Sequence, residues 1–213
     1  MQVSTVLTLA DSRLPTGGHV HSGGVEEAIA QGLVRDVPTV EAFLTRRLRT
    51  SGAVAASIAA AVCAGFLNAT AAEAETDART PSPAARRSSR AQGRGLLRLA
   101  TTTWPEHDWA ALGRRPHLPV VAGVVGRVVG LTGQDLASVQ IYTTMTGAAI
   151  AAQRLLALDP SEVAACTLRL ARICNEVTDQ VCAELPALID LSDPLLDVLS
   201  ESHALRERPL FVS

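Results

Sequence analysis

The sequence contains no lysine and very few aromatic residues. All 19 basic residues are arginines. Schiff-base catalysis and phosphate binding by a P-loop both need a lysine, so this chain can perform neither. Aromatic residues make up 3% of the chain, whereas alanine dominates segments such as AVAASIAAAVCAG. Because alanine is the strongest helix former, the composition predicts an all-α protein of closely packed helices.

Strong charge and a targeting signal are also missing. The 213 residues carry a formal net charge of -2, and 47% of them are hydrophobic. This balance gives no indication of nucleic-acid binding, and the length predicts one domain over residues 1–213. The first 13 residues lack the basic start and apolar run of a signal peptide. We therefore predict a cytoplasmic protein.

Two further features are read as buried structure. Residues 51–72 carry no charge, but alanine and serine dominate them and Asn68 interrupts them, so they predict a buried helix and no membrane span. Cys166, Cys174 and Cys182 recur every eight residues. That spacing is about 12 Å of helix, too long for a disulfide or for a shared metal ion. We expect all four cysteines, Cys63 included, to be buried thiols.

The apolar spacing predicts eight to ten helices in one bundle. Ser22 and Thr39 are the expected N-caps of two early helices, and residues 73–82 have the composition of a loop. Gly126 and Gly130 lie four apart in a helix beginning at Pro119, so they predict close approach of another helix. Two long helices that meet at Pro160 predict an antiparallel hairpin, which should supply much of the core.

The most unusual segment is DSRLPTGGHVHSGGVEEA, residues 11–28. It has no lysine for a P-loop and no G-x-S-x-G for a nucleophile elbow. A structural bend into a helix is one interpretation, because proline fixes φ and glycine allows positive φ. The alternative is a helical metal-dependent hydrolase that uses His19, His21 and Glu26. A third interpretation is a regulator that binds nucleic acid through the five arginines from Arg86 to Arg98.

Four segments resemble the UreF family of urease accessory proteins. The first matches at Leu14, Pro15, Gly17, Gly18, Ser22, Gly24 and Glu26. The second matches at Ser89, Gly93, Leu96 and Leu97, and the third at His117, Pro119, Val120 and Gly123. The tail SESHALRERPLFVS is similar to the family ending. The order and spacing of the four segments cover almost the full length.

The sequence also departs from the family pattern. His19 stands where the family usually has an aromatic residue, and Val25 stands in place of leucine. In the tail, Ala204 and Pro209 replace the expected glutamate and arginine. The family's P-L-G-Q-x-x-G-Q loop is replaced here by LALDPSEVA. These departures concern the regions that would contact partners, and they leave the expected fold unchanged.

The resemblance implies an all-α scaffold with no catalytic activity and no tightly bound cofactor. Such a protein forms a homodimer, binds UreD/UreH and recruits the GTPase UreG, so that apo-urease receives nickel at its carbamylated lysine. Nickel would be handled by the complex and GTP by UreG, with no nucleic acid and no membrane involved.

Motif matching assigns ten residues to partner or dimer contacts: Pro15, His19, His21, Ser22, Glu26, Tyr142, Arg154, His203, Phe211 and Ser213. Each also has a purely structural interpretation. Glu26 could stabilise a helix N-terminus, and Tyr142 could be a core ring. Arg154 could lie on the open surface, and His203 could cap a helix end or lie in solvent.

Overall fold

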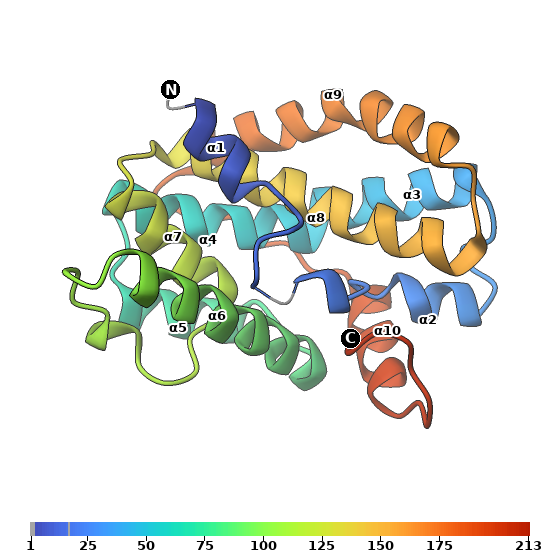
Figure 1. The fold of residues 1–213 in the computed structure, drawn as a ribbon, viewed down its shortest axis with the longest axis horizontal. Helices are drawn as coiled ribbons and strands as arrows, with labels where there is room; N and C mark the ends of the chain where they lie inside the picture. Colours follow the sequence, from blue (N-terminus) through green and yellow to red (C-terminus); the bar gives the residue numbers. More distant parts are fainter. Residues whose placement is uncertain (1–2, 17) are drawn as a thin grey trace.

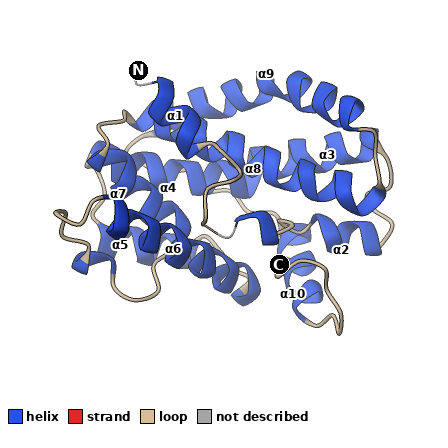
Figure 2. Ribbon diagram, viewed as in Figure 1, coloured by secondary structure: helices blue, strands red, loops and turns tan. Residues whose placement is uncertain are grey.

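A computed structural model describes residues 3–16 and 18–213, and those residues form helices and loops without a strand (Figures 1 and 2). This confirms the all-α class. Gly17 of the first family segment lies outside the described residues. No helix within these ranges is long and apolar enough to cross a membrane. The α-helices are α1 (Val3–Leu9), α2 (Val25–Ala30), α3 (Val37–Arg47), α4 (Ala53–Ala64), α5 (Ala69–Ala78), α6 (Pro83–Thr103), α7 (Leu118–Val128), α8 (Gly133–Leu156), α9 (Pro160–Glu184) and α10 (Pro194–Ala204).

The predicted hairpin of two long helices is confirmed as α8 and α9. Asp159 caps α9 by accepting a hydrogen bond from the Ser161 amide at 2.6 Å, and Pro160 occupies the first turn. Proline is favoured there because the missing N–H has no partner inside the helix. The two helices lie side by side along one side of the molecule (Figure 1).

Helix α4 is the centre of the core. Ten of its residues are buried, and it packs between α7 on one side and the α8–α9 hairpin on the other. Gly123 of α7 faces Val62 and Ala59, where an added methyl group would come within 2.5 Å of the Val62 Cβ. Small residues therefore bring α7 and α4 together, as predicted. The face consists of Gly123 and Gly126, however, because α7 has ended before Gly130.

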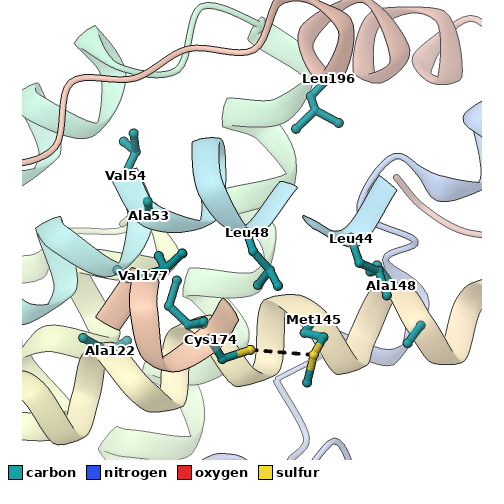
Figure 3. Packing of buried hydrophobic residues seen from close by; sticks show 14 of the residues in the cluster. Leu44, Leu48, Ala53, Val54, Ala122, Met145, Ala148, Cys174, Val177 and Leu196 are labelled. Carbon is teal, nitrogen blue, oxygen red and sulfur yellow. Dashed lines mark hydrogen bonds between the residues drawn. The ribbon is translucent and has the colours of Figure 1, made fainter. Parts of the chain in front are cut away.

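The buried cysteines confirm the interpretation of three thiols as small core residues. Cys63, Cys166 and Cys174 are buried, whereas Cys182 is half-buried, and all four are free. The Cys174 thiol lies 3.7 Å from the Met145 sulfur between α9 and α8 (Figure 3). Burial raises the pKa of the Cys166 and Cys174 thiols to about 11, so both stay protonated at neutral pH.

Four local predictions from the sequence were wrong. The uncharged run 51–72 is not one helix, because α4 stops at Gly65 and α5 starts after its Asn68 cap. Residues 73–82 are mostly helical, in α5. The N-cap of α3 is Asp36, and Thr39 is the third helical residue of the same capping box. The N-cap of α2 is Gly24, two residues beyond Ser22.

Candidate functional site

The first family segment and the tail meet in one cluster, which we call the tail–loop junction: residues 20–27, Ser88 of α6 and residues 203–213. In Figure 1 the C-terminus lies beside the start of α2. Two backbone hydrogen bonds join the segments directly, from the Ser22 amide to the Ser213 carbonyl at 2.5 Å and from the Val212 amide to the Val20 carbonyl at 2.7 Å. The segment before α2 and the C-terminal tail therefore form one surface.

Glu26 is the hub of this junction. Its carboxylate accepts hydrogen bonds from the His203 Nε2 at 2.7 Å, the Leu210 amide at 2.7 Å and the Phe211 amide at 3.0 Å. Burial raises the pKa of the Glu26 carboxyl, but the three hydrogen bonds outweigh burial and hold the pKa below its usual range. Glu26 is therefore ionised in the fold, and it binds the tail more than it stabilises a helix end.

The local backbone explains how Glu26 reaches the tail. Gly24, the N-cap of α2, adopts a φ of 90°, which favours glycine. This turn places Glu26 and Glu27 in the first helical turn. Glu27 adds a second link, because its carboxylate pairs with Arg206 at 3.0 Å and accepts from Gln31 at 2.9 Å. Two adjacent acidic residues thus bind the segment that follows α10.

His21, Ser88 and Ser213 form the other half of the junction. The His21 Nδ1 lies 2.5 Å from the Ser213 hydroxyl and 3.1 Å from the Ser88 hydroxyl, and the two hydroxyls are 2.7 Å apart. Burial lowers the pKa of His21 to about 4, with further lowering by the positive charges of protonated His19 and His203. At neutral pH the imidazole is uncharged and acts as a hydrogen-bonding group.

The structure brings six of the ten predicted residues together and leaves four outside the junction. His21, Ser22, Glu26, His203, Phe211 and Ser213 belong to it. Pro15 and His19 are exposed in the preceding loop, and Tyr142 and Arg154 are exposed on α8. The core interpretation of Tyr142 was wrong, since 47% of its surface is exposed. Both structural interpretations of His203 were also wrong, because its ring is buried against Glu26.

The hydrolase alternative requires His19, His21 and Glu26 to act on one ligand. The structure gives Glu26 and His21 different partners, and His19 is exposed. Across residues 3–16 and 18–213, no group of three histidine, cysteine, aspartate or glutamate side chains gathers in a way that could hold a metal ion. The arrangement thus fits a structural link between segments better than a metal centre.

The second and third family segments meet at a buried histidine. The His117 Nδ1 lies 3.0 Å from the Ser89 hydroxyl, and its Nε2 lies 2.9 Å from the Asp77 carboxylate. The composition is that of a catalytic triad, but the His117 ring is fully buried and Ser89 also accepts from the Leu118 amide at 3.3 Å. We interpret this cluster as a structural hydrogen-bond network that connects α5, α6 and the start of α7.

The basic helix is α6, and acidic residues of α5 neutralise part of it. Arg90 pairs with Glu73 and with Asp77, both at 2.8 Å. These pairs explain why the polar segment 73–82 is helical, because its acidic residues face the arginines of α6. Arg87, Arg94 and Arg98 remain exposed and make no ion pair within the described part of the chain.

Sequence reasoning missed Ser88, Glu27, Arg206 and the Leu210 amide. Ser88 and Glu27 each lie next to a family position, Ser89 and Glu26, and that adjacency was the available signal. The Leu210 amide gave no signal, since every residue except proline carries one.

Fold and site together define an all-helical protein whose N-terminal loop and C-terminal tail form one connected surface. A family model described as UreF matches residues 34–171. Curated relatives called "Urease accessory protein UreF" extend the match to 99% of both chains. They include a protein of Mycobacterium sp. (strain JLS) at 65% identity over 211 residues and one of Mycolicibacterium vanbaalenii at 62% over 214. A third, from Mycobacterium marinum, is 61% identical over 211 residues. The chain belongs to the UreF family of urease accessory proteins.

Proposed function

We propose that this protein is a non-catalytic scaffold for nickel insertion into urease. It forms a homodimer, binds UreD/UreH and recruits the GTPase UreG, so that apo-urease receives its nickel in the cytoplasm. The names of the relatives support the role in urease maturation. The missing lysine supports the division of labour, because GTP chemistry through a P-loop has to come from a partner.

The observation that carries the proposal is an apolar tail held in a fixed position. Leu205, Leu210 and Val212 are 84%, 80% and 67% exposed. Glu26 binds the Leu210 amide and Val20 binds the Val212 amide, so these side chains are displayed on an anchored backbone. Apolar residues presented by an ordered segment are typical of protein interfaces, because their burial against a partner is favourable. We assign this tail surface to UreD/UreH.

A second exposed surface suits the homodimer. Tyr142 is exposed on α8, and α1, which packs on α8, exposes Val3 and Leu7 by 50% and 65%. A two-fold contact uses the same patch of both copies, and tyrosine combines a large apolar ring with a polar tip there. Arg154 lies further along α8 and could add a polar contact at the rim.

The test combines binding with rescue of activity. The full chain should co-purify with UreD/UreH and UreG, restore urease activity in a strain that lacks this gene, and sediment as a dimer. The scaffold proposal is wrong if the chain neither binds these partners nor restores activity.

A matched pair of variants tests the tail surface. Leu210→Ser should weaken capture of UreD/UreH, because it removes an exposed apolar contact. Leu168→Ser, at a similarly exposed site on α9, should leave capture unchanged, since Leu168 is 76% exposed and does not belong to the tail. Equal capture by both variants would show that UreD/UreH binds elsewhere.

A further inference from the structure

A cavity of about 850 Å³ lies behind the tail–loop junction. Its walls come from the loop after α1, from α4, α6 and α8, and from α10 with the tail. Five arginines and three aspartates line it. Arg13 pairs with Asp11 inside the lining, and Asp193 and Arg79 of the lining pair with Arg46 and Glu75 outside it. Three arginines and one aspartate of the lining are left without such a pair in the described part of the chain: Arg47, Arg87, Arg154 and Asp197. The cavity therefore has an excess of positive charge.

Among the described residues, Arg47 is the arginine of this wall whose buried Nε has no acceptor. Its Nη1 donates to the Gly23 carbonyl at 2.6 Å, while its buried Nε has no acceptor among residues 3–16 and 18–213. Within the same residues, the Nη2 makes no hydrogen bond and no carboxylate pairs with the guanidinium. Burial lowers the pKa of Arg47 to about 10, yet the group remains charged at neutral pH. A charged group with a buried, unused donor is costly in a folded protein unless a ligand or water satisfies it.

The free edge of Arg47 has a defined shape. Because Gly23 takes Nη1, the donors left are Nε and Nη2, which are parallel and lie in one plane. This edge of a guanidinium matches two oxygens of a planar oxyanion. The backbone after Arg47 is also unusual, since Leu48–Gly52 form a π-helical segment between α3 and α4. Such segments occur often at functional sites.

Neighbouring groups fit the same ligand class. Arg87 and Arg154 also line the cavity and make no ion pair within the described ranges. The hydroxyls of Ser51 and Thr144 belong to the lining as well, and Gly52 beside them packs against Thr144. Positive charge with nearby hydroxyl groups is an environment for an anion, and it disfavours a bare metal cation.

We propose that Arg47 binds a small planar oxyanion of the carboxylate or bicarbonate type in this cavity. The site is independent of the scaffold function, because it requires only the isolated chain. A failure to capture UreD/UreH would contradict the scaffold proposal but not the anion site. A failure to bind anions would contradict the anion site but not the scaffold proposal.

The experiment measures anion binding to the purified full chain by calorimetry. The probes are sodium bicarbonate, sodium acetate and sodium phosphate, with sodium chloride at equal ionic strength as the reference. Bicarbonate or acetate should bind saturably. Arg47→Gln should bind about tenfold more weakly or worse, since it loses charge-assisted hydrogen bonds. Arg114→Gln, at an exposed arginine outside the lining, should bind like the unaltered chain.

The binding of phosphate, compared with that of bicarbonate and acetate, tests whether the site prefers a planar anion. Weaker binding of phosphate than of bicarbonate or acetate supports the planar site, and equal or tighter binding of phosphate overturns the assignment to a planar oxyanion. Absence of saturable binding overturns the proposal, and so does equal binding by Arg47→Gln. If that variant fails to fold, crystals of the unaltered protein grown with acetate decide: density for acetate on the Arg47 Nε supports the site, and its absence overturns it.

Discussion

The Glu26 carboxylate and the His203 ring are joined at 2.7 Å although 177 residues separate them in the sequence. Only 5% of the Glu26 side chain and 3% of the His203 side chain are exposed. Buried charged groups are stable only when they are hydrogen-bonded, and Glu26 meets this condition with three donors. The Glu26 carboxylate is consequently the buried charged group among the contacts that hold the tail, beside the Glu27–Arg206 pair and the two backbone hydrogen bonds.

Glu26→Gln should weaken the attachment of the tail. The amide keeps the shape, but it offers one acceptor oxygen and brings an NH₂ group toward donors. We expect a loss of about 1–3 kcal/mol in the free energy of unfolding, measured by urea denaturation. Limited proteolysis should show faster cleavage within residues 205–213. Glu162→Gln, at an exposed position on α9, is the control. Identical cleavage in both variants would show that Glu26 does not hold the tail.

The contribution of Glu26 should depend on pH. Its pKa in the fold lies below the ordinary glutamate value of 4.5, so the unfolded chain takes up the proton first as the pH falls. The stabilisation is fully present above about pH 4.5 and is lost as the pH falls through the folded pKa. The difference in unfolding free energy between the unaltered chain and Glu26→Gln should therefore shrink below that pH. A difference that grew on acidification would contradict the assignment.

His21 should titrate well below an ordinary histidine. Its pKa is lowered from 6.5 to about 4, mainly by burial, so the uncharged form is the stable one in the fold. The depressed pKa stabilises the fold above about pH 6.5, and this contribution is lost as the pH falls toward about 4. A proton NMR titration of the His21 ring measures the value directly. A midpoint near 6.5 would mean that the ring is solvated and that the contact with Ser213 is not stable.

Two glycine positions should respond to the same substitution with opposite signs. A methyl group at Gly93 on α6 would overlap the backbone of Pro116 and His117, so Gly93→Ala should cost about 1–3 kcal/mol of stability. At Gly147, inside α8, an added methyl group meets nothing within 4 Å. Gly147→Ala should therefore stabilise the helix by about 0.5–1 kcal/mol. Thermal unfolding of both variants tests this, and destabilisation by Gly147→Ala would contradict the open space described there.

The sequence predicted the elements whose signals are local. Alanine content and the proline at 160 were enough for the all-α class and for the α8–α9 hairpin. The N-cap of α3 was misplaced because a threonine at a helix start can be either the N-cap or the third helical residue of a capping box. Thr39 is the third helical residue, and Asp36 is the cap. Helix α5 was missed because its polar residues look like a loop until Arg90 of α6 is placed opposite them.

The sequence predicted several residues of the site but not the contacts between them. The family motifs identified Glu26, His203 and Phe211, and no pattern in the sequence indicated that they touch. Glu26 binds the backbone amide of Phe211, a group that every residue except proline carries, and the two residues are 185 positions apart in the sequence. Contacts of this kind depend on the whole fold, so periodicity and local motifs cannot reveal them.

The order of synthesis determines when the tail–loop junction can form. A ribosome makes the Leu210 amide 184 residues after Glu26, so the carboxylate lacks that partner until the later residue has been synthesised. A nascent chain that has not reached residue 210 also lacks Leu210 and Val212, two of the three exposed apolar residues of the tail. The surface proposed for UreD/UreH is therefore completed only after residues 210–212 have been made.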